Sequence, residues 1–219
     1  MATNIFNYAA GIDLDRRRTV FREVTASGYQ RSRVNSPLFY YVNVTLRPCY
    51  RNVYRLVDND IQAFQDGIAT VRARIPHGIT YAQGDWTAGT PVVMGADQTG
   101  MNVNISGLTN GSVLRQGDFI QFNSDSENDA GRYKVYQLTS DATVSNGSAT
   151  ISLNTGLISS PRHNQVITVG SQVQFNLLLQ EIPGTTTIPG MSGGMDNALD
   201  ALYNWNGQFI FREVLPLVS

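Results

Sequence analysis

The chain has 219 residues, of which 42% are hydrophobic and only 15% are charged, and its formal net charge is −1. A chain of this length buries about 70% of its unfolded surface, so folding requires neither a disulfide framework nor a structural metal. The composition excludes a disordered tail and a long charged helix, and it indicates a folded protein rich in β-structure.

The small net charge conceals an asymmetry along the chain. Residues 1–75 contain eleven arginines and six acidic residues, whereas residues 76–219 contain five basic and eleven acidic residues. Lys134 is the only lysine. Arginine is favoured at desolvated contacts of fixed geometry, and a basic and an acidic part of one chain suit a head-to-tail contact between copies. A purely compositional bias against lysine is an equally open explanation.

Cys49 is the only cysteine, so an intrachain disulfide and a cysteine-based zinc site are excluded. The N-terminus lacks the basic start and apolar core of a secretory signal, and no run of about 18 apolar residues is present. We therefore expect a protein that is made in the cytoplasm and does not enter a membrane.

The first third of the chain predicts strand, helix and strand after a short strand at residues 20–25. Apolar residues alternate with a period of two over 38–46, which is typical of a strand. Residues 52–66 have helical spacing and end at Gly67, and a strand resumes over 68–75.

The middle of the chain changes character twice. Residues 76–110 are rich in Gly, Thr, Pro and Asn and predict an extended loop with small hairpins, with short strands at 91–94 and 101–105. Asn146-Gly147 is the strongest signal for a tight hairpin, because both central residues of a type I′ turn need positive φ. Over 114–182 we expect a small antiparallel barrel or sandwich. Its strands are predicted at 112–115, 119–122, 132–139, 148–153, 166–169 and 172–182.

The last segment predicts a loop over 183–194, a short helix over 196–205 and a terminal strand over 208–215. A terminal strand usually pairs back into a sheet. We therefore expect residues 1–77 and 183–219 to form one domain, into which residues 78–182 are inserted.

Motifs that could carry chemistry are weak. Gly190-Met-Ser192-Gly-Gly194 matches the nucleophile-elbow pattern, but the only histidines, His77 and His163, precede the serine. The acidic run Asp125–Asp129 departs from the calcium-loop pattern, and a polar hairpin tip or a weak cation site remain open. We expect no catalytic residue, no cofactor and no metal.

Two parts of the sequence resemble virion proteins of tailed bacteriophages. The stretches LRQGDFIQF (114–122), YKVYQLT (133–139) and GSATISL (147–153) are similar to a three-stranded module of these proteins, with a Gly-Asp turn and a tight hairpin. The stretch GYQRSR (28–33), followed by strand, helix and a strand ending VRARIP (71–76), resembles the opening of distal-tail or baseplate proteins. The resemblance covers about two thirds of the chain, and the segment 79–110 and the predicted terminal helix depart from it.

The resemblance implies a mainly β protein with a ring-forming antiparallel sandwich or barrel domain, one helix, an inserted small barrel and a short C-terminal helix. It implies a structural, non-enzymatic component of the phage tail tip or baseplate, assembled in the host cytoplasm as a ring of six copies against other tail proteins. A membrane is not an expected partner, because no long apolar run is present. Nucleic acid is not an expected partner either, since Asp13 and Asp15 precede the short run of arginines. The candidate interface residues are Arg16, Arg17, Arg18, Arg31, Arg33, Phe39, Tyr41, Asn43 and Thr45.

Two alternatives stay open. The protein could belong to the head side of the virion, as a neck, adaptor or capsid-decorating protein. It could also bind carbohydrate or act on peptidoglycan, with Trp86 or Trp205 and tyrosine side chains as the binding surface.

Overall fold

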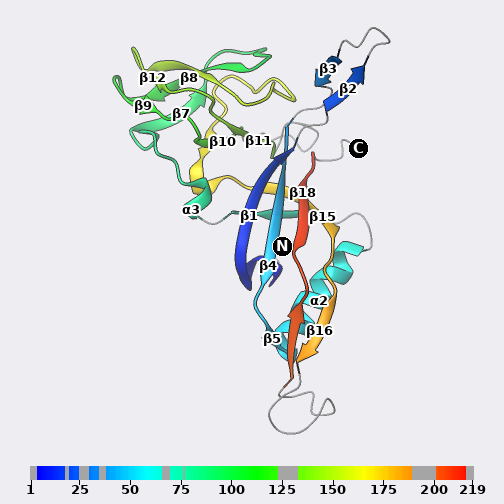
Figure 1. Ribbon diagram of the computed structural model, residues 1–219. Coiled ribbons are helices and arrows are strands. Elements are labelled where there is room, and N and C mark those ends of the chain that lie inside the picture. The colour runs from blue at the N-terminus through cyan, green and yellow to red at the C-terminus, as the bar shows by residue number, and fades with distance from the viewer. Residues whose placement is uncertain are drawn as a thin grey trace. The chain divides into compact units, whose positions relative to one another are not determined.

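Figure 1 shows the computed structural model of the chain, which describes residues 4–17, 20–24, 30–34, 38–65, 70–75, 77–122, 133–188 and 201–215. The chain forms two compact units. The first contains Met1–Asp15, Tyr40–Ala73 and Asn176–Val214, and the second contains Arg16–Phe39, Arg74–Phe175 and Leu215–Ser219. The first unit thus joins segments that are far apart in the sequence. The independent folding of residues 78–182 stays a prediction for limited proteolysis.

The first unit is built on a five-stranded sheet whose strands are distant in sequence. Their order is β1 (Ala9–Arg17), β4 (Phe39–Leu46), β18 (Phe209–Glu213), β15 (Phe175–Glu181) and β6 (Val71–Ala73). β18 pairs antiparallel with both β4 and β15, and β1, β4 and β18 lie side by side in Figure 1. The predicted strands at 38–46 and 208–215 are therefore confirmed. β1 and the preceding short helix α1 (Asn4–Asn7) were not predicted.

Helix α2 (Arg51–Gln65) confirms the predicted helix and contributes its apolar stripe to the core of this unit. Val57, Ile61 and Phe64 are buried, at the i, i+4, i+7 spacing of one helix face. The Phe64 ring meets the Phe211 ring of β18 edge to face, with centroids 6.0 Å apart.

A second sheet of the first unit corrects the predicted C-terminal helix. β16 (Thr185–Ile188), β17 (Leu202–Trp205) and β5 (Cys49–Tyr50) form it in that order. Residues 202–205 are a strand because Tyr203 and Trp205 both stack on Tyr54 of α2, with centroids 4.3 and 5.4 Å away, and a period of two is needed to place both there. The remainder of the predicted helix, 196–200, lies outside the described residues. β16 also replaces part of the loop predicted over 183–194.

In its described residues the second unit contains the two-stranded hairpin of residues 20–34 and three further small antiparallel sheets. The first of these three has the order β13 (Ser148–Ser152), β8 (Asn102–Leu108) and β7 (Gly89–Val93). The second has the order β11 (Val135–Gln137), β10 (Phe119–Phe122) and β14 (Ile167–Val169). The third pairs β12 (Ala142–Thr143) with β9 (Val113–Leu114). The short α3 (His77–Thr80) and the 3-10 turn η1 (Gly170–Gln172) complete it. Among the described residues no closed barrel is found, so the predicted barrel is not confirmed.

The short strands predicted at 91–94 and 101–105 are confirmed as β7 and β8, and β8 extends to Leu108, beyond its predicted end. β8 alternates exposed and buried residues, and Val103 and Ile105 lie in the same apolar cluster as Val93 of β7. β8 pairs with β13, over forty residues later in the chain. This pairing buries the strands and turns a Gly- and Thr-rich segment into part of the core.

Two predicted turns have the expected conformation. Asn146 and Gly147 have φ of 51° and 75°, and Ser145 pairs with Ser148 across them. Gly117, with φ of 95°, precedes Asp118 in the turn that leads into β10. Both turns need the left-handed backbone that Gly and Asn adopt at low cost.

Candidate interface

A two-stranded hairpin is the most unusual element of the chain. β2 (Val20–Val24) and β3 (Gln30–Val34) pair antiparallel along their whole lengths, from Val20 opposite Val34 to Val24 opposite Gln30. The sheet contains no third strand among the described residues. An isolated two-stranded hairpin is at best marginally stable in water, so this element, which we call the arm, needs packing beyond its own two strands.

The arm contains two of the predicted interface residues. Arg33 lies opposite Phe21, and Arg31 lies opposite Glu23. The stretch from Val20 to Val34 contains three arginines and one glutamate. The predicted Arg18 lies outside the described residues.

The two folded units also differ in net charge, although by less than the two parts of the sequence do. The first unit has nine acidic and five basic residues, a net charge of −4, and the second has eleven basic and eight acidic residues, a net charge of +3. Residues 16–39, which include the arm, carry six arginines and one glutamate, a net charge of +5. The basic charge is therefore concentrated on the arm and its flanks.

Arg16 and Arg17 lie at the exposed end of β1. The Arg16 guanidinium donates a hydrogen bond from Nη1 to Gln137 Oε1 over 2.7 Å. Arg16 is thus held within its own chain, and its part in an interface stays a prediction.

The remaining predicted residues share one side of β4, as alternation requires. Tyr40, Val42, Val44 and Leu46 are buried on one side, and Phe39, Tyr41, Asn43 and Thr45 are half-buried on the other. Across the sheet, Ile210 lies opposite Asn43 and Arg212 opposite Tyr41. This second side is therefore a mixture of aromatic, aliphatic and polar groups.

One member of that set contacts the only lysine. Lys134 is fully buried and donates from Nζ to the carbonyl of Val135 over 3.0 Å. Its ammonium lies 5.5 Å from the ring centroid of Phe39 and 5.7 Å from that of Tyr136. Cation–π attraction of this kind holds Phe39 within its own chain.

Sequence reasoning missed the role of Asp118, the second residue of the Gly-Asp turn. Its buried carboxylate accepts hydrogen bonds from the backbone N–H groups of Gln83 and Gly84 at 2.7 and 3.0 Å and from Trp86 Nε1 at 2.6 Å. It also accepts one from the backbone N–H of Arg115 at 3.3 Å. The turn therefore holds residues 83–86, more than thirty residues earlier in the chain. No local sequence pattern predicts this contact.

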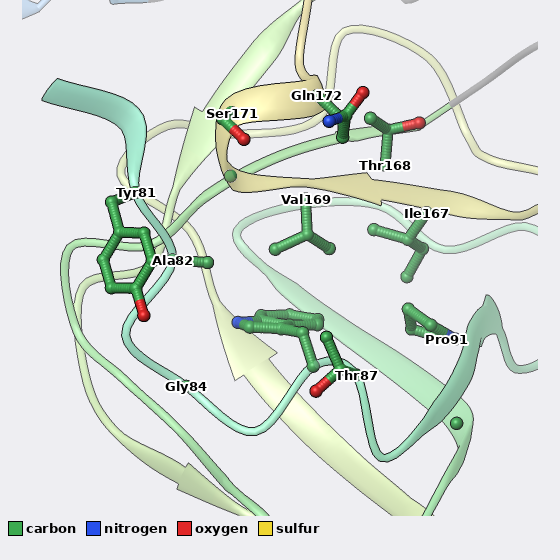
Figure 2. Close-up of a pocket in the computed structure, with 13 residues that line it drawn as sticks. Tyr81, Ala82, Gly84, Thr87, Pro91, Ile167, Thr168, Val169, Ser171 and Gln172 are labelled. Carbon is green, nitrogen blue, oxygen red and sulfur yellow. The ribbon is translucent and has the colours of Figure 1, made fainter. Parts of the chain in front are cut away.

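A pocket of about 570 Å³ lies beside this anchor, between residues 81–91 and 167–172 (Figure 2). The side chains of Pro91, Ile167 and Val169 point into it, while Tyr81 stands at its edge. The lining is apolar with a few hydroxyl and amide groups and includes no charged side chain. Such a lining is suited to apolar contacts and does not supply groups for acid–base chemistry.

The two tryptophans do not form the exposed surface that the carbohydrate-binding alternative requires. Trp86 and Trp205 are only 5% and 6% exposed, and they belong to the apolar cores of the second and the first unit. Stacking of a sugar needs an accessible ring face, which neither indole presents on the outer surface, although Trp86 is one of the residues that line the pocket.

The other candidate groups are not brought together. His163 accepts a hydrogen bond at Nδ1 from the backbone N–H of Gly95 over 2.9 Å. Burial raises the pKa of the half-buried Cys49 thiol, which keeps it protonated at neutral pH. Ser192 and the Asp125–Asp129 run lie outside the described residues, and so does the side chain of His77. Within the described part of the chain, no three His, Cys, Asp or Glu side chains are placed to hold a metal ion.

No helix in the described ranges is both long and apolar enough to cross a membrane. Comparison with models of known protein families and with curated proteins finds no match for the chain.

Proposed function

We propose that the protein is a structural component of a bacteriophage virion, which assembles with copies of itself into a ring at the tail tip or baseplate. The observation that carries this proposal is the arm, a basic hairpin in a sheet of two strands. An isolated hairpin is marginally stable in water, and contacts with another chain would add to its stability.

The distribution of charge supports a contact between unlike surfaces of two copies. Residues 16–39 carry a net charge of +5, and the first unit carries −4. Contact between two different patches of the same chain is heterologous, and it gives a closed ring when the rotation between copies closes. Electrostatic complementarity favours this pairing over contact of like patches.

In this proposal the first unit is the ring-building β domain, with its two sheets and α2 as the sandwich. The second unit is the inserted module, whose Gly117-Asp118 turn and Asn146-Gly147 hairpin are the features that resemble phage tail proteins. The half-buried side of β4, with Tyr41, Asn43 and Thr45, is a further surface for neighbouring chains.

The proposal is tested by measuring the mass of the purified protein. Multi-angle light scattering over a hundredfold range of concentration is expected to show one species of several copies, six if the resemblance holds, and negative-stain electron microscopy is expected to show rings. A protein that remains monomeric over the whole range contradicts the ring.

The position in the virion needs a separate measurement. Immunogold labelling of phage particles is expected to place the protein at the distal end of the tail. Label at the neck or on the capsid instead supports the head-side alternative.

A further inference from the structure

The pocket beside Asp118 is lined entirely by residues of the second unit (Figure 2). Its volume of about 570 Å³ lies within the range of pockets that hold small molecules. Tyr81, Thr87 and Gln172 belong to its lining and are exposed, so the pocket is open to solvent. A ligand can therefore enter it without any opening of the fold.

The wall formed by residues 83–86 is fixed before any ligand binds. The carboxylate of Asp118 accepts hydrogen bonds from the backbone N–H groups of Gln83 and Gly84, at 2.7 and 3.0 Å. It also accepts one from Trp86 Nε1 at 2.6 Å, which sets the orientation of the indole. A site that is already formed loses little conformational freedom on binding, and this favours affinity.

Three polar side chains of the lining are available to a ligand. In the described part of the chain, the hydroxyls of Thr87 and Ser171 and the amide of Gln172 form no hydrogen bond with another residue. A purely apolar ligand would remove water from these groups without giving them a partner, which costs free energy. The ligand that fits must therefore carry hydrogen-bonding groups of its own.

The rest of the lining restricts the charge and the shape of that ligand. Pro91, Ile167 and Val169 point into the pocket (Figure 2), and no charged side chain lines it. A phosphate, carboxylate or ammonium group would lose hydration there without meeting an opposite charge. A neutral ligand with both apolar faces and polar edges matches this lining.

Tyr81 supplies the accessible aromatic ring that neither tryptophan presents. It stands at the edge of the pocket (Figure 2) and is 57% exposed. A tyrosine ring is apolar on its faces and carries one polar group, so it packs well against ligands that are themselves amphipathic. A sugar ring is such a ligand, because its faces are C–H groups and its edge is a circle of hydroxyls.

We propose that this pocket binds one ring of a neutral saccharide. The C–H face of the sugar lies on Tyr81, and its hydroxyls bond to the side chains of Thr87, Ser171 and Gln172. The inference goes beyond the proposed structural role and does not depend on the ring of copies, since every residue of the site comes from one unit of one chain.

A glycan array is the first test. The purified protein is applied to an array that carries neutral, sialylated and phosphorylated glycans, and the neutral oligosaccharides that bind are titrated by calorimetry. We expect binding to a subset of the neutral glycans, with a Kd of about 1 mM or lower for a site that holds a single sugar. Absence of binding to any neutral glycan at about 10 mM, or binding to charged glycans alone, overturns the proposal.

Substitution of the exposed tyrosine then locates the site. Tyr81→Ala is expected to raise the Kd about tenfold, whereas Tyr81→Phe, which keeps the ring, should stay within about threefold. The matched control is Tyr50→Ala in β5, because Tyr50 is 59% exposed and lies in the first unit. It should leave the Kd unchanged. Equal effects of Tyr81→Ala and Tyr50→Ala contradict the site.

The polar side chains give an independent check. Ser171→Ala and Gln172→Ala are each expected to raise the Kd about threefold to tenfold through the loss of a hydrogen bond to the sugar. An unchanged Kd in both variants overturns the assigned contacts. Thermal unfolding of each variant should match that of the unmodified protein, since neither side chain is bonded within the described chain.

The outcomes separate this inference from the proposed function. A multimer that binds no neutral glycan overturns the saccharide site and leaves the ring intact, whereas a monomer that binds one overturns the ring alone. If glycans fail to bind and Tyr81→Ala instead raises the concentration of half-assembly, the pocket holds a side chain of a neighbouring protein, and the saccharide proposal is wrong.

Discussion

The region around Asp118 and the arm are two β-structures that differ in how far they are bonded to the rest of their own chain. Around Asp118, three donors from a segment more than thirty residues earlier and one from the nearby Arg115 converge on one buried carboxylate, and the surrounding strands share one apolar cluster. The arm pairs only with itself in the described residues. Where hydrogen bonds and apolar contacts close within the chain, substitutions should change the stability of one copy. In the proposed ring a second copy completes the arm, so substitutions in the arm should change assembly.

The largest effect is expected at the buried carboxylate. Asp118→Ala removes the acceptor for Gln83, Gly84 and Trp86 and leaves their N–H groups without a partner in a buried site. We expect a loss of about 3–5 kcal/mol in the free energy of unfolding, measured by urea denaturation. Asp97→Asn is the control, because Asp97 is exposed and Asn tolerates its positive φ of 57°, and it should change stability by less than about 0.5 kcal/mol. Equal effects of the two substitutions would refute the role of Asp118.

A somewhat smaller loss is expected from crowding the same anchor. A Cβ at Gly84 would lie 2.8 Å from Asp118 Oδ2 and 2.9 Å from the backbone nitrogen of Arg115. Gly84→Ala should therefore cost about 1–3 kcal/mol in the same measurement. At Gly184 a Cβ meets nothing within 4 Å, so Gly184→Ala should be neutral within about 0.5 kcal/mol. A tolerated Gly84→Ala would mean that the 83–86 segment can move away from its anchor.

The arm should show the reverse behaviour. Replacing Val20–Val34 by a short Gly-Ser linker should change the unfolding free energy of the monomer by less than about 1 kcal/mol, since an isolated hairpin contributes little. The same deletion should abolish multimers in light scattering. A large loss of monomer stability would place the arm with the Asp118 region instead, as an element completed within its own chain.

The smallest effect is expected at an exposed ion pair of the second unit. The backbone N–H of Gln116 and then the guanidinium of Arg115, 2.8 Å away, hold the pKa of the exposed Asp141 below its ordinary value. Because the pKa is lower in the folded state, the stabilisation is present above the ordinary carboxyl pKa and is lost as the pH falls through the folded value. Asp141→Asn should therefore lower stability slightly at neutral pH and not at all at strongly acidic pH, in paired denaturation curves. A stability difference between the variant and the unmodified protein that grows on acidification would contradict this prediction.

Local chemistry was enough to predict several elements of this chain. The period of two over 38–46 predicted β4 and the shared side of Phe39, Tyr41, Asn43 and Thr45. Helical spacing predicted α2, and Asn146-Gly147 predicted its hairpin, because each of these signals lies within a few residues. Arg31 and Arg33 were selected as interface residues from sequence alone, and whether they contact another copy stays a prediction.

Long-range contacts decided the rest. The spacing of Leu199, Leu202 and Tyr203 suits a helix, yet residues 202–205 form a strand because their neighbours are β16, β5 and Tyr54 of α2. The Gly-Asp turn was visible in the sequence, but the four donors that Asp118 collects were not. The period of two in a strand's sequence predicts only which residues share a side of the strand. Which strand lies beside it, and whether its edge is paired, depends on residues tens of positions away and is decided only when the chain folds.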